Sequence, residues 1–196
     1  LVRWITGSRA YQLSSRVGER NAADDPAAGR VPLFNRVPAK PFTPEQVFDS
    51  LKIAAVGEAY TQDEFFDRRD EREAWVQQFF DVLENEENGE LSTFGGSLTQ
   101  ALTLINGPLM TAALSGEPGT VLHRILTARL SDEERVRALC RAALARDPTD
   151  AEWRKFRRQL GHAKADRTHD PRAQVNEILR DIYWAYLNSS EFLTNR

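Results

Sequence analysis

The clearest pattern in the chain is a run of apolar residues near its C-terminal end, repeated every three or four positions. Such spacing places side chains on one face of an α-helix. The run consists of Val175, Ile178, Leu179, Ile182, Tyr183, Tyr186 and Leu187. Trp184 lies about 100° away from this face. The pattern predicts a central helix that buries Tyr183 and Tyr186 and leaves Trp184 for a second contact surface.

Two further stretches have the same spacing. They contain Trp75, Val76, Phe79, Phe80 and Leu83, and Val136, Leu139, Cys140, Ala143 and Leu144. The second stripe predicts that Cys140 is a buried core residue. No stretch alternates with period two between turn signals, so we expect no substantial sheet.

Helix-start signals recur along the chain. A Ser or Thr followed three residues later by Glu or Gln forms a reciprocal capping box. The pairs are Thr43 with Gln46, Thr61 with Glu64, Ser97 with Gln100, Ser131 with Glu134 and Thr149 with Glu152, and Asp170-Pro171 is a sixth start. Typical helix stops are Gly57, Gly107, Gly116 and Gly161. These signals predict an all-α fold, a single irregular helical domain of six or seven helices over residues 1–196.

Two segments lack the helical pattern. Residues 17–42 carry Pro26, Pro32, Pro38 and Pro41, which predicts a long extended segment. Its apolar residues indicate that it packs across the helical domain. Residues 84–96 form an acidic loop with the sequence ENEENGELSTFGG.

A short pattern occurs three times, as ITGSRAY (5–11), LINGPLM (104–110) and YLNSSEF (186–192). In each, an apolar helix end meets Gly or Asn, residue types that tolerate a left-handed turn. We expect such a turn at Gly7, at Asn106 or Gly107, and at Asn188. Ser8 and Ser189 would then cap the following turn, and Phe192 would fold back onto the helix before it.

Bulk composition excludes some classes of protein. The chain has 196 residues, of which 41% are hydrophobic and 28% charged, an ordinary globular balance. Its net charge of −3 is too small to indicate nucleic acid or an anionic membrane as a partner. No apolar run approaches the roughly 20 residues of a membrane span. The chain begins with Leu1 and has no leader pattern, so we expect a fragment or a processed product.

Five blocks, in order, resemble one known family. They are GSRAYQLSS (7–15), LFNRVPAKPFTPEQVFDSL (33–51), ENGELSTFGGSLTQALTLING (87–107), LCRAALARDPTDAEW (139–153) and YWAYLNSSEFLTNR (183–196). Together they resemble the C-terminal domain of unknown function that closes many large planctomycete proteins. In those proteins it typically follows a planctomycete cytochrome-c-like domain and a second uncharacterised domain.

The resemblance implies a periplasmic or otherwise extracytoplasmic location. The implied partners are upstream domains of the same polypeptide or another envelope protein. It supplies no established activity and no catalytic residues. The chain itself lacks the Cys-x-x-Cys-His pattern, and Cys140 is its single cysteine. It therefore cannot hold a c-type haem covalently, and we expect no cofactor, with Ca²⁺ as the one possible exception.

The acidic loop is the candidate Ca²⁺ site. Five carboxylates lie in it or just before it, namely Asp81, Glu84, Glu86, Glu87 and Glu90. A Ca²⁺ ion requires six to eight oxygen ligands held by a tight turn, and the spacing does not fit an EF-hand. The alternative is a solvated helix end and loop.

Candidate catalytic residues come from the polar positions of the matching blocks. They are Glu45, Gln46, Asp49, Gln100 and Asn106. Glu45 and Gln46 have an alternative role in capping a helix. No nucleophile-elbow, phosphate-loop or dinucleotide-binding pattern accompanies them.

Other polar groups favour structural roles. His162 and His169 lie in a polar connector, where metal binding is the less favoured alternative. We expect His123 to be a half-buried or surface residue. The basic run RKFRR (154–158) is typical of a salt-bridged helix face and does not interleave aromatics as nucleic-acid sites do.

Three hypotheses follow. The leading one is a non-catalytic helical accessory or interaction module of a larger planctomycete-type extracytoplasmic protein. The second is part of an enzyme domain whose site is shared with an upstream domain. The third is a module stabilised by Ca²⁺ at residues 81–90.

Overall fold

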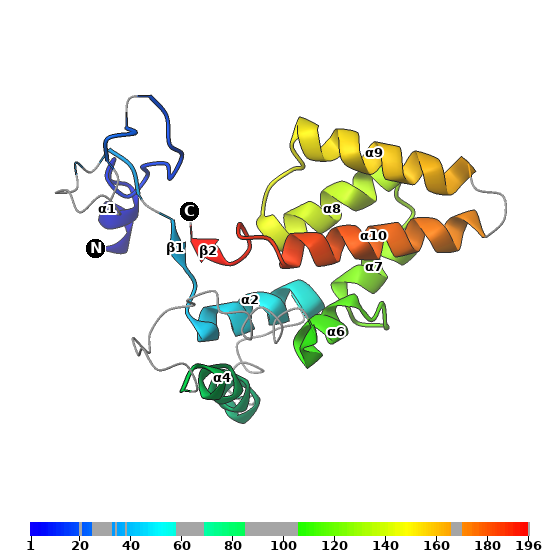
Figure 1. Ribbon diagram of the computed structural model, residues 1–196, viewed down its shortest axis with the longest axis horizontal. Coiled ribbons are helices and arrows are strands. Elements are labelled where there is room, and N and C mark those ends of the chain that lie inside the picture. Colours follow the sequence, from blue (N-terminus) through cyan, green and yellow to red (C-terminus); the bar gives the residue numbers. More distant parts are fainter. Residues whose placement is uncertain are drawn as a thin grey trace. The chain divides into compact units, whose positions relative to one another are not determined.

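The structure, a computed structural model, describes residues 1–19, 21–24, 33, 35–37, 39–57, 69–84, 106–165 and 170–195. Side chains of residues 78–84, 164–165 and 195 are outside this description. The fold is all-α, as the sequence predicts, but the described ranges hold eight helices where six or seven were expected (Figure 1). The chain divides into two compact units, the first comprising Leu1–Pro41 and Thr194–Arg196 and the second Phe42–Leu193.

The second unit contains seven of these helices. They are α2 (Pro44–Val56), α4 (Arg69–Glu84), α6 (Pro108–Leu114), α7 (Val121–Thr127), α8 (Asp132–Leu144), α9 (Asp150–Ala165) and α10 (Pro171–Leu187). Helix α10 packs against α8, α9 and α6, and α2 packs against α6, α4 and α7. The last long helix is therefore central to this unit, as its apolar stripe predicts.

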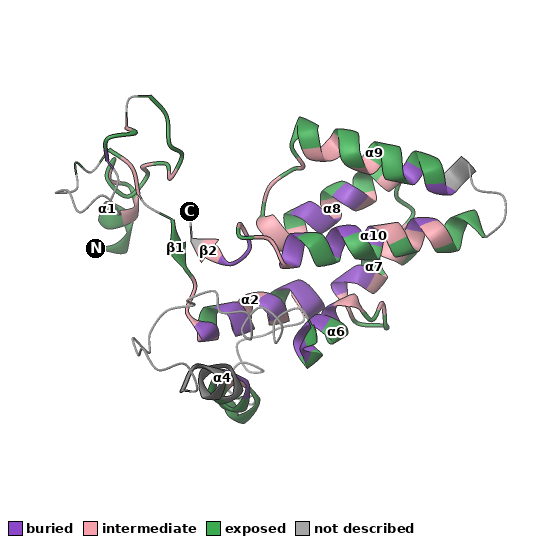
Figure 2. Ribbon diagram, viewed as in Figure 1, coloured by how far each residue is buried: buried purple, intermediate pink, exposed green. Residues whose placement is uncertain are grey.

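The core of the second unit lies along the inner faces of these helices, where Figure 2 shows the buried residues of α2, α6, α7, α8 and α10. Its largest fully buried side chains include Tyr183, Phe48, Leu51, Met110, Leu122, Leu139, Leu179 and Leu187. Tyr186 and Val175 are also buried and Ile178 is partly buried. The stripe read from the sequence of α10 is thus confirmed as the core-facing side.

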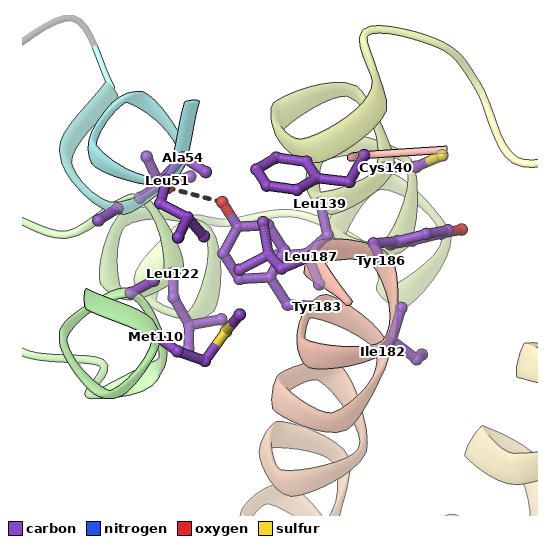
Figure 3. Packing of buried hydrophobic residues seen from close by; sticks show 14 of the residues in the cluster. Leu51, Ala54, Met110, Leu122, Leu139, Cys140, Ile182, Tyr183, Tyr186 and Leu187 are labelled. Atoms are coloured by element: carbon purple, nitrogen blue, oxygen red, sulfur yellow. Dashed lines mark hydrogen bonds between the residues drawn. The ribbon is translucent and has the colours of Figure 1, made fainter. Parts of the chain in front are cut away.

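A buried hydroxyl joins α10 to the end of α2. The Tyr183 hydroxyl donates to the carbonyl oxygen of Ala54 at 2.6 Å, the contact drawn in Figure 3. Ala54 belongs to the last turn of α2, where carbonyl groups lack partners within the helix. The Arg124 guanidinium donates to the neighbouring carbonyl of Val56 at 2.9 Å. Side chains from α10 and α7 therefore complete the C-terminal end of α2.

The predicted helix starts are confirmed where the structure describes them. Thr43 with Gln46 and Ser131 with Glu134 form reciprocal capping boxes. Thr149 and Glu152 make the same pair of hydrogen bonds at the start of α9. Asp170 caps α10, and Pro171 is its first residue. The pairs at Thr61 and Ser97 lie outside the described residues.

The predicted helix ends are only partly right. Gly57 and Gly116 have φ of 67° and 68° and follow helices as expected. Gly161, however, lies within α9, where a glycine costs only about 1 kcal/mol relative to alanine. Gly107 is the N-cap of α6 and begins a helix. The left-handed residue that ends α8 is Ala145, with φ of 53°.

The expected left-handed turns at Gly7, Gly107 and Asn188 are also wrong, because all three residues have negative φ. At Asn188, the side-chain amide donates to the carbonyl of Trp184 at 2.9 Å, which satisfies the helix end without a left-handed residue. The expected serine caps are confirmed, since the Ser8 hydroxyl accepts from the Tyr11 amide at 3.2 Å. The Ser189 hydroxyl accepts from the Phe192 amide at 3.2 Å, and Phe192 is buried.

The first unit contains α1 (Val2–Thr6) and a two-residue antiparallel pair, β1 (Lys40–Pro41) with β2 (Thr194–Asn195). Asp24 organises the described part of the 17–42 segment. Its carboxylate accepts from the amides of Leu33 at 2.9 Å and Asn35 at 2.7 Å. These amides hold the pKa of Asp24 below its usual value. The expected position of this segment across the helices stays a prediction.

Candidate interaction surface

Two of the candidate catalytic residues have structural partners. The carboxylate of Asp49 accepts two hydrogen bonds from the Arg72 guanidinium, from Nε to Oδ1 at 3.1 Å and from Nη2 to Oδ2 at 3.0 Å. This pair connects α2 with α4, as does the ion pair of Lys52 with Glu71 at 2.6 Å. The side chain of Gln46 accepts from the Thr43 amide at 2.9 Å. Asp49 and Gln46 therefore hold helices in place.

A catalytic role for Glu45, Asn106 and Gln100 stays a prediction. Glu45 lies in the first turn of α2, and Asn106 is exposed just before α6. Gln100 lies outside the described residues. Among the residues that the structure describes, no group of three or more His, Cys, Asp or Glu side chains gathers as a metal site would require.

The acidic loop is mostly beyond the described ranges. Asp81 and Glu84 belong to the last turns of α4, but their side chains are not described. Glu86, Glu87 and Glu90 lie outside the described residues altogether. Ca²⁺ binding at this loop stays a prediction.

A charged cluster that the sequence did not indicate consists of Arg146, Glu152 and Glu191. We call it the Arg146 cluster. Arg146, just after α8, donates to both oxygens of Glu191 at 2.8 and 2.7 Å. It also donates to both oxygens of Glu152, at the start of α9, at 2.9 and 3.0 Å. Arg146 lowers the pKa of Glu152 to about 2, against the opposing effect of burial. The cluster fastens the turn after α10 to the α8–α9 junction.

Cys140 lies beside this cluster and is buried, as predicted. Burial raises the pKa of its thiol, so the unreactive protonated form dominates at neutral pH. The Sγ atom is 3.7 Å from Nη1 of Arg146. Burial also raises the pKa of Tyr186, whose hydroxyl interacts electrostatically with Cys140.

The basic run lies on the exposed side of α9, as expected, and one of its residues forms a salt bridge. Arg154, Lys155, Arg157 and Arg158 are exposed. Arg157 pairs with Glu133 of α8 at 3.1 Å and lies over the ring of Trp153 at 5.6 Å. A pocket of about 150 Å³ opens here, lined by Glu133, Arg137, Asp147, Pro148, Asp150 and Trp153. Within its walls, Nε of Arg137 lies 3.9 Å from Oδ1 of Asp147.

A larger hollow of about 450 Å³ lies between α9 and α10. Gln159, His162 and Ala163 of α9 form one wall. Gln174, Glu177, Ile178 and Asp181 of α10 form the other wall. His162 is exposed, and His123 is half-buried with Nδ1 2.8 Å from the carbonyl oxygen of Gly116. His169 lies outside the described residues.

Exposed apolar side chains mark two candidate contact surfaces. In the second unit, Trp184 of α10 is 40% exposed although Tyr183 and Tyr186 beside it are buried. In the first unit, no residue of α1 is buried, and Trp4 is 82% exposed. Both surfaces are candidates because Trp is enriched in the cores of protein interfaces.

No helix among the described residues has the length and apolar character needed to cross a membrane. Comparison with protein-family models, curated proteins and solved structures gives no match to this chain.

Proposed function

We propose that this chain is a non-catalytic helical interaction module of a larger, planctomycete-type extracytoplasmic protein. Its partner is a neighbouring domain of the same polypeptide or another envelope protein. The family and the location rest on the five sequence blocks that resemble the planctomycete C-terminal domain. The interaction role rests on an exposed aromatic side chain of the second unit.

Trp184 carries this proposal. Helix α10 buries its apolar stripe but leaves Trp184 40% exposed in its last turn. The residues four positions before and after it, Arg180 and Asn188, share its side of the helix. A large aromatic anchor with a polar surround is the arrangement typical of interface hot spots.

The non-catalytic part of the proposal is supported by the structural roles of two candidate catalytic residues. The carboxylate of Asp49 is held by Arg72, and the amide of Gln46 caps α2. Both side chains have partners that stabilise the helices. A general base or acid requires a side chain that can reach a substrate.

The test is binding to the domain that precedes this one in the full polypeptide, with both partners purified. Trp184→Ala should weaken binding by roughly 30-fold, the loss of about 2 kcal/mol typical of a hot-spot residue. Trp4→Ala is the matched control, since Trp4 is also an exposed tryptophan but lies in the first unit. A well-folded chain that does not bind the preceding domain would exclude the intra-chain partner.

A further inference from the structure

The two units carry opposite charge, which the net charge of −3 conceals. Residues 1–41 and 194–196 contain eight Lys or Arg and three Asp or Glu. Residues 42–193 contain eighteen Lys or Arg and twenty-six Asp or Glu. The expectation that charge does not indicate an anionic partner therefore has to be revised for the first unit, because a local excess sets the local potential.

The basic charge of the first unit coincides with its exposed apolar residues. We define the N-terminal patch as residues 1–17. It contains Arg3, Arg9 and Arg16, all exposed, and no Asp or Glu. Its exposed apolar side chains are Leu1 (89%), Val2 (74%), Trp4 (82%), Ile5 (51%), Tyr11 (62%) and Val17 (65%). Figure 2 shows α1 as mostly exposed, with Thr6 half-buried.

The spacing within the patch brings these side chains together. Leu1, Trp4 and Ile5 are separated by three and four positions, which places them on one side of α1. A helix of five residues is marginal by itself in water, and α1 buries none of its residues. A partner that removes this apolar side from water would stabilise the helix while leaving Arg3 at the boundary with water.

We propose that the N-terminal patch binds the surface of a membrane that contains anionic phospholipid. Trp4 and Ile5 would enter the boundary between headgroups and acyl chains, where tryptophan is favoured. Arg3, Arg9 and Arg16 would lie against the lipid phosphates, where each cation is attracted by the negative surface potential. This binding goes beyond the proposed interaction through Trp184 and uses different residues.

The mixture of side chains favours lipid over other anionic partners. Sites for single-stranded nucleic acid offer aromatic rings for stacking, whereas Leu1, Val2 and Ile5 are aliphatic. Protein interfaces deplete charge from their apolar centre, whereas Arg3 lies between Val2 and Trp4 in the sequence. A membrane surface accommodates both groups, because apolar depth and phosphate charge lie a few ångströms apart.

The test is flotation of the 196-residue chain with two kinds of vesicle. One kind is pure phosphatidylcholine, and in the other about a third of the lipid is phosphatidylglycerol. Three arginines near the surface should raise partitioning onto the anionic vesicles by roughly 100-fold. Added salt should reverse most of this gain through screening. Equal binding to both vesicles, or binding to neither, would overturn the proposal.

Two variants identify the residues responsible. Trp4→Ala should weaken binding to both vesicles, and Arg3→Glu with Arg9→Glu should remove the preference for the anionic ones. Neither should change the thermal midpoint, because these residues are exposed. Trp184→Ala is the control and should bind vesicles as the parent chain does. If Trp4→Ala binds as well as the parent chain, the patch is not the membrane contact, whatever the outcome for Trp184 and the preceding domain.

Discussion

The two units of this chain differ in what holds them together. The second unit closes around large apolar side chains, with Tyr183, Leu139 and Leu187 fully buried. The first unit is ordered by hydrogen bonds to one buried carboxylate, that of Asp24. Several of its apolar residues, such as Trp4, are exposed.

This difference indicates that one unit supplies the folding free energy and the other offers a contact surface. Burial of apolar area is the main source of folding free energy, so the second unit supplies the stability of the chain. None of the described apolar residues of the first unit is buried, and its order rests on local hydrogen bonds with low opening free energy. Apolar side chains that do not stabilise the fold remain available for a partner.

The largest effect is expected from removing residues 186–196. The deletion removes Tyr186, Leu187, Phe192 and Leu193, all buried in the core. Each large-to-small change at such a site costs about 2–5 kcal/mol, which together exceeds the stability of a typical domain. The cooperative melt measured by circular dichroism should disappear. By contrast, deleting residues 1–6 should leave the midpoint unchanged, and a loss there would contradict the comparison.

A smaller effect is expected from Arg146→Ala. The change leaves the half-buried carboxylates of Glu152 and Glu191 without their cation. We expect a loss of about 2 kcal/mol in the free energy of unfolding, measured with urea. Arg157→Ala is the matched control, since its pair with Glu133 is exposed and should contribute less than about 1 kcal/mol. Equal losses would show that Arg146 contributes no more than a surface pair.

The same cluster predicts a pH dependence in the acid range. The pKa of Glu152 is lowered from 4.5 to about 2 in the folded state, so the unfolded state binds more protons between these values. Its contribution is complete above pH 4.5 and is lost as the pH falls toward 2. Urea midpoints measured from pH 7 to 3 should fall more steeply for the parent chain than for Arg146→Ala. Parallel curves would contradict this coupling.

Tyr183→Phe is expected to cost about 1–2 kcal/mol. It removes the hydrogen bond to Ala54 and leaves a buried carbonyl at the end of α2 without this donor. Tyr186→Phe is the control, because the buried Tyr186 hydroxyl lies beside the thiol of Cys140, a weaker hydrogen-bonding group than a backbone carbonyl. That change should cost less than about 1 kcal/mol. Equal losses of unfolding free energy for the two variants would show that the two hydroxyl groups have equivalent surroundings.

The smallest global effect is expected from Asp24→Asn. The change removes the charge that accepts the amides of Leu33 and Asn35. Hydrogen exchange of these two amides should accelerate while the thermal midpoint of the second unit stays the same. A lowered midpoint would show that the second unit depends on the first for its stability.

Local patterns in the sequence were sufficient for much of the second unit. The stripe of α10 and the capping box at Ser131 depend on residues three or four positions apart, and both are confirmed. Local signals failed where packing outweighs propensity. Gly161 continues α9 because its helix buries Leu160 and Ala163, and Ala145 adopts a left-handed conformation that glycine was expected to supply.

The candidate surfaces were predictable only in part. Trp184 could be recognised because its angle on α10 follows from its sequence position. The Arg146 cluster could not, because Glu191 is 45 residues away and no local spacing connects them. The N-terminal patch was concealed by the whole-chain charge. The positive charge of the first unit is visible only when it is counted separately from the second unit.

The hydrogen bond between Tyr183 and Ala54 spans 129 residues of sequence. Closing so long a loop carries an entropy cost that has to be met before the contact forms, and such non-local contacts slow folding. During synthesis, α2 leaves the ribosome long before α10 is made. The apolar face of α2 therefore stays partly exposed until α10 can pack in the same core. The second unit should therefore complete its folding only after α10 has been synthesised, and its apolar surface is open to chaperones until then.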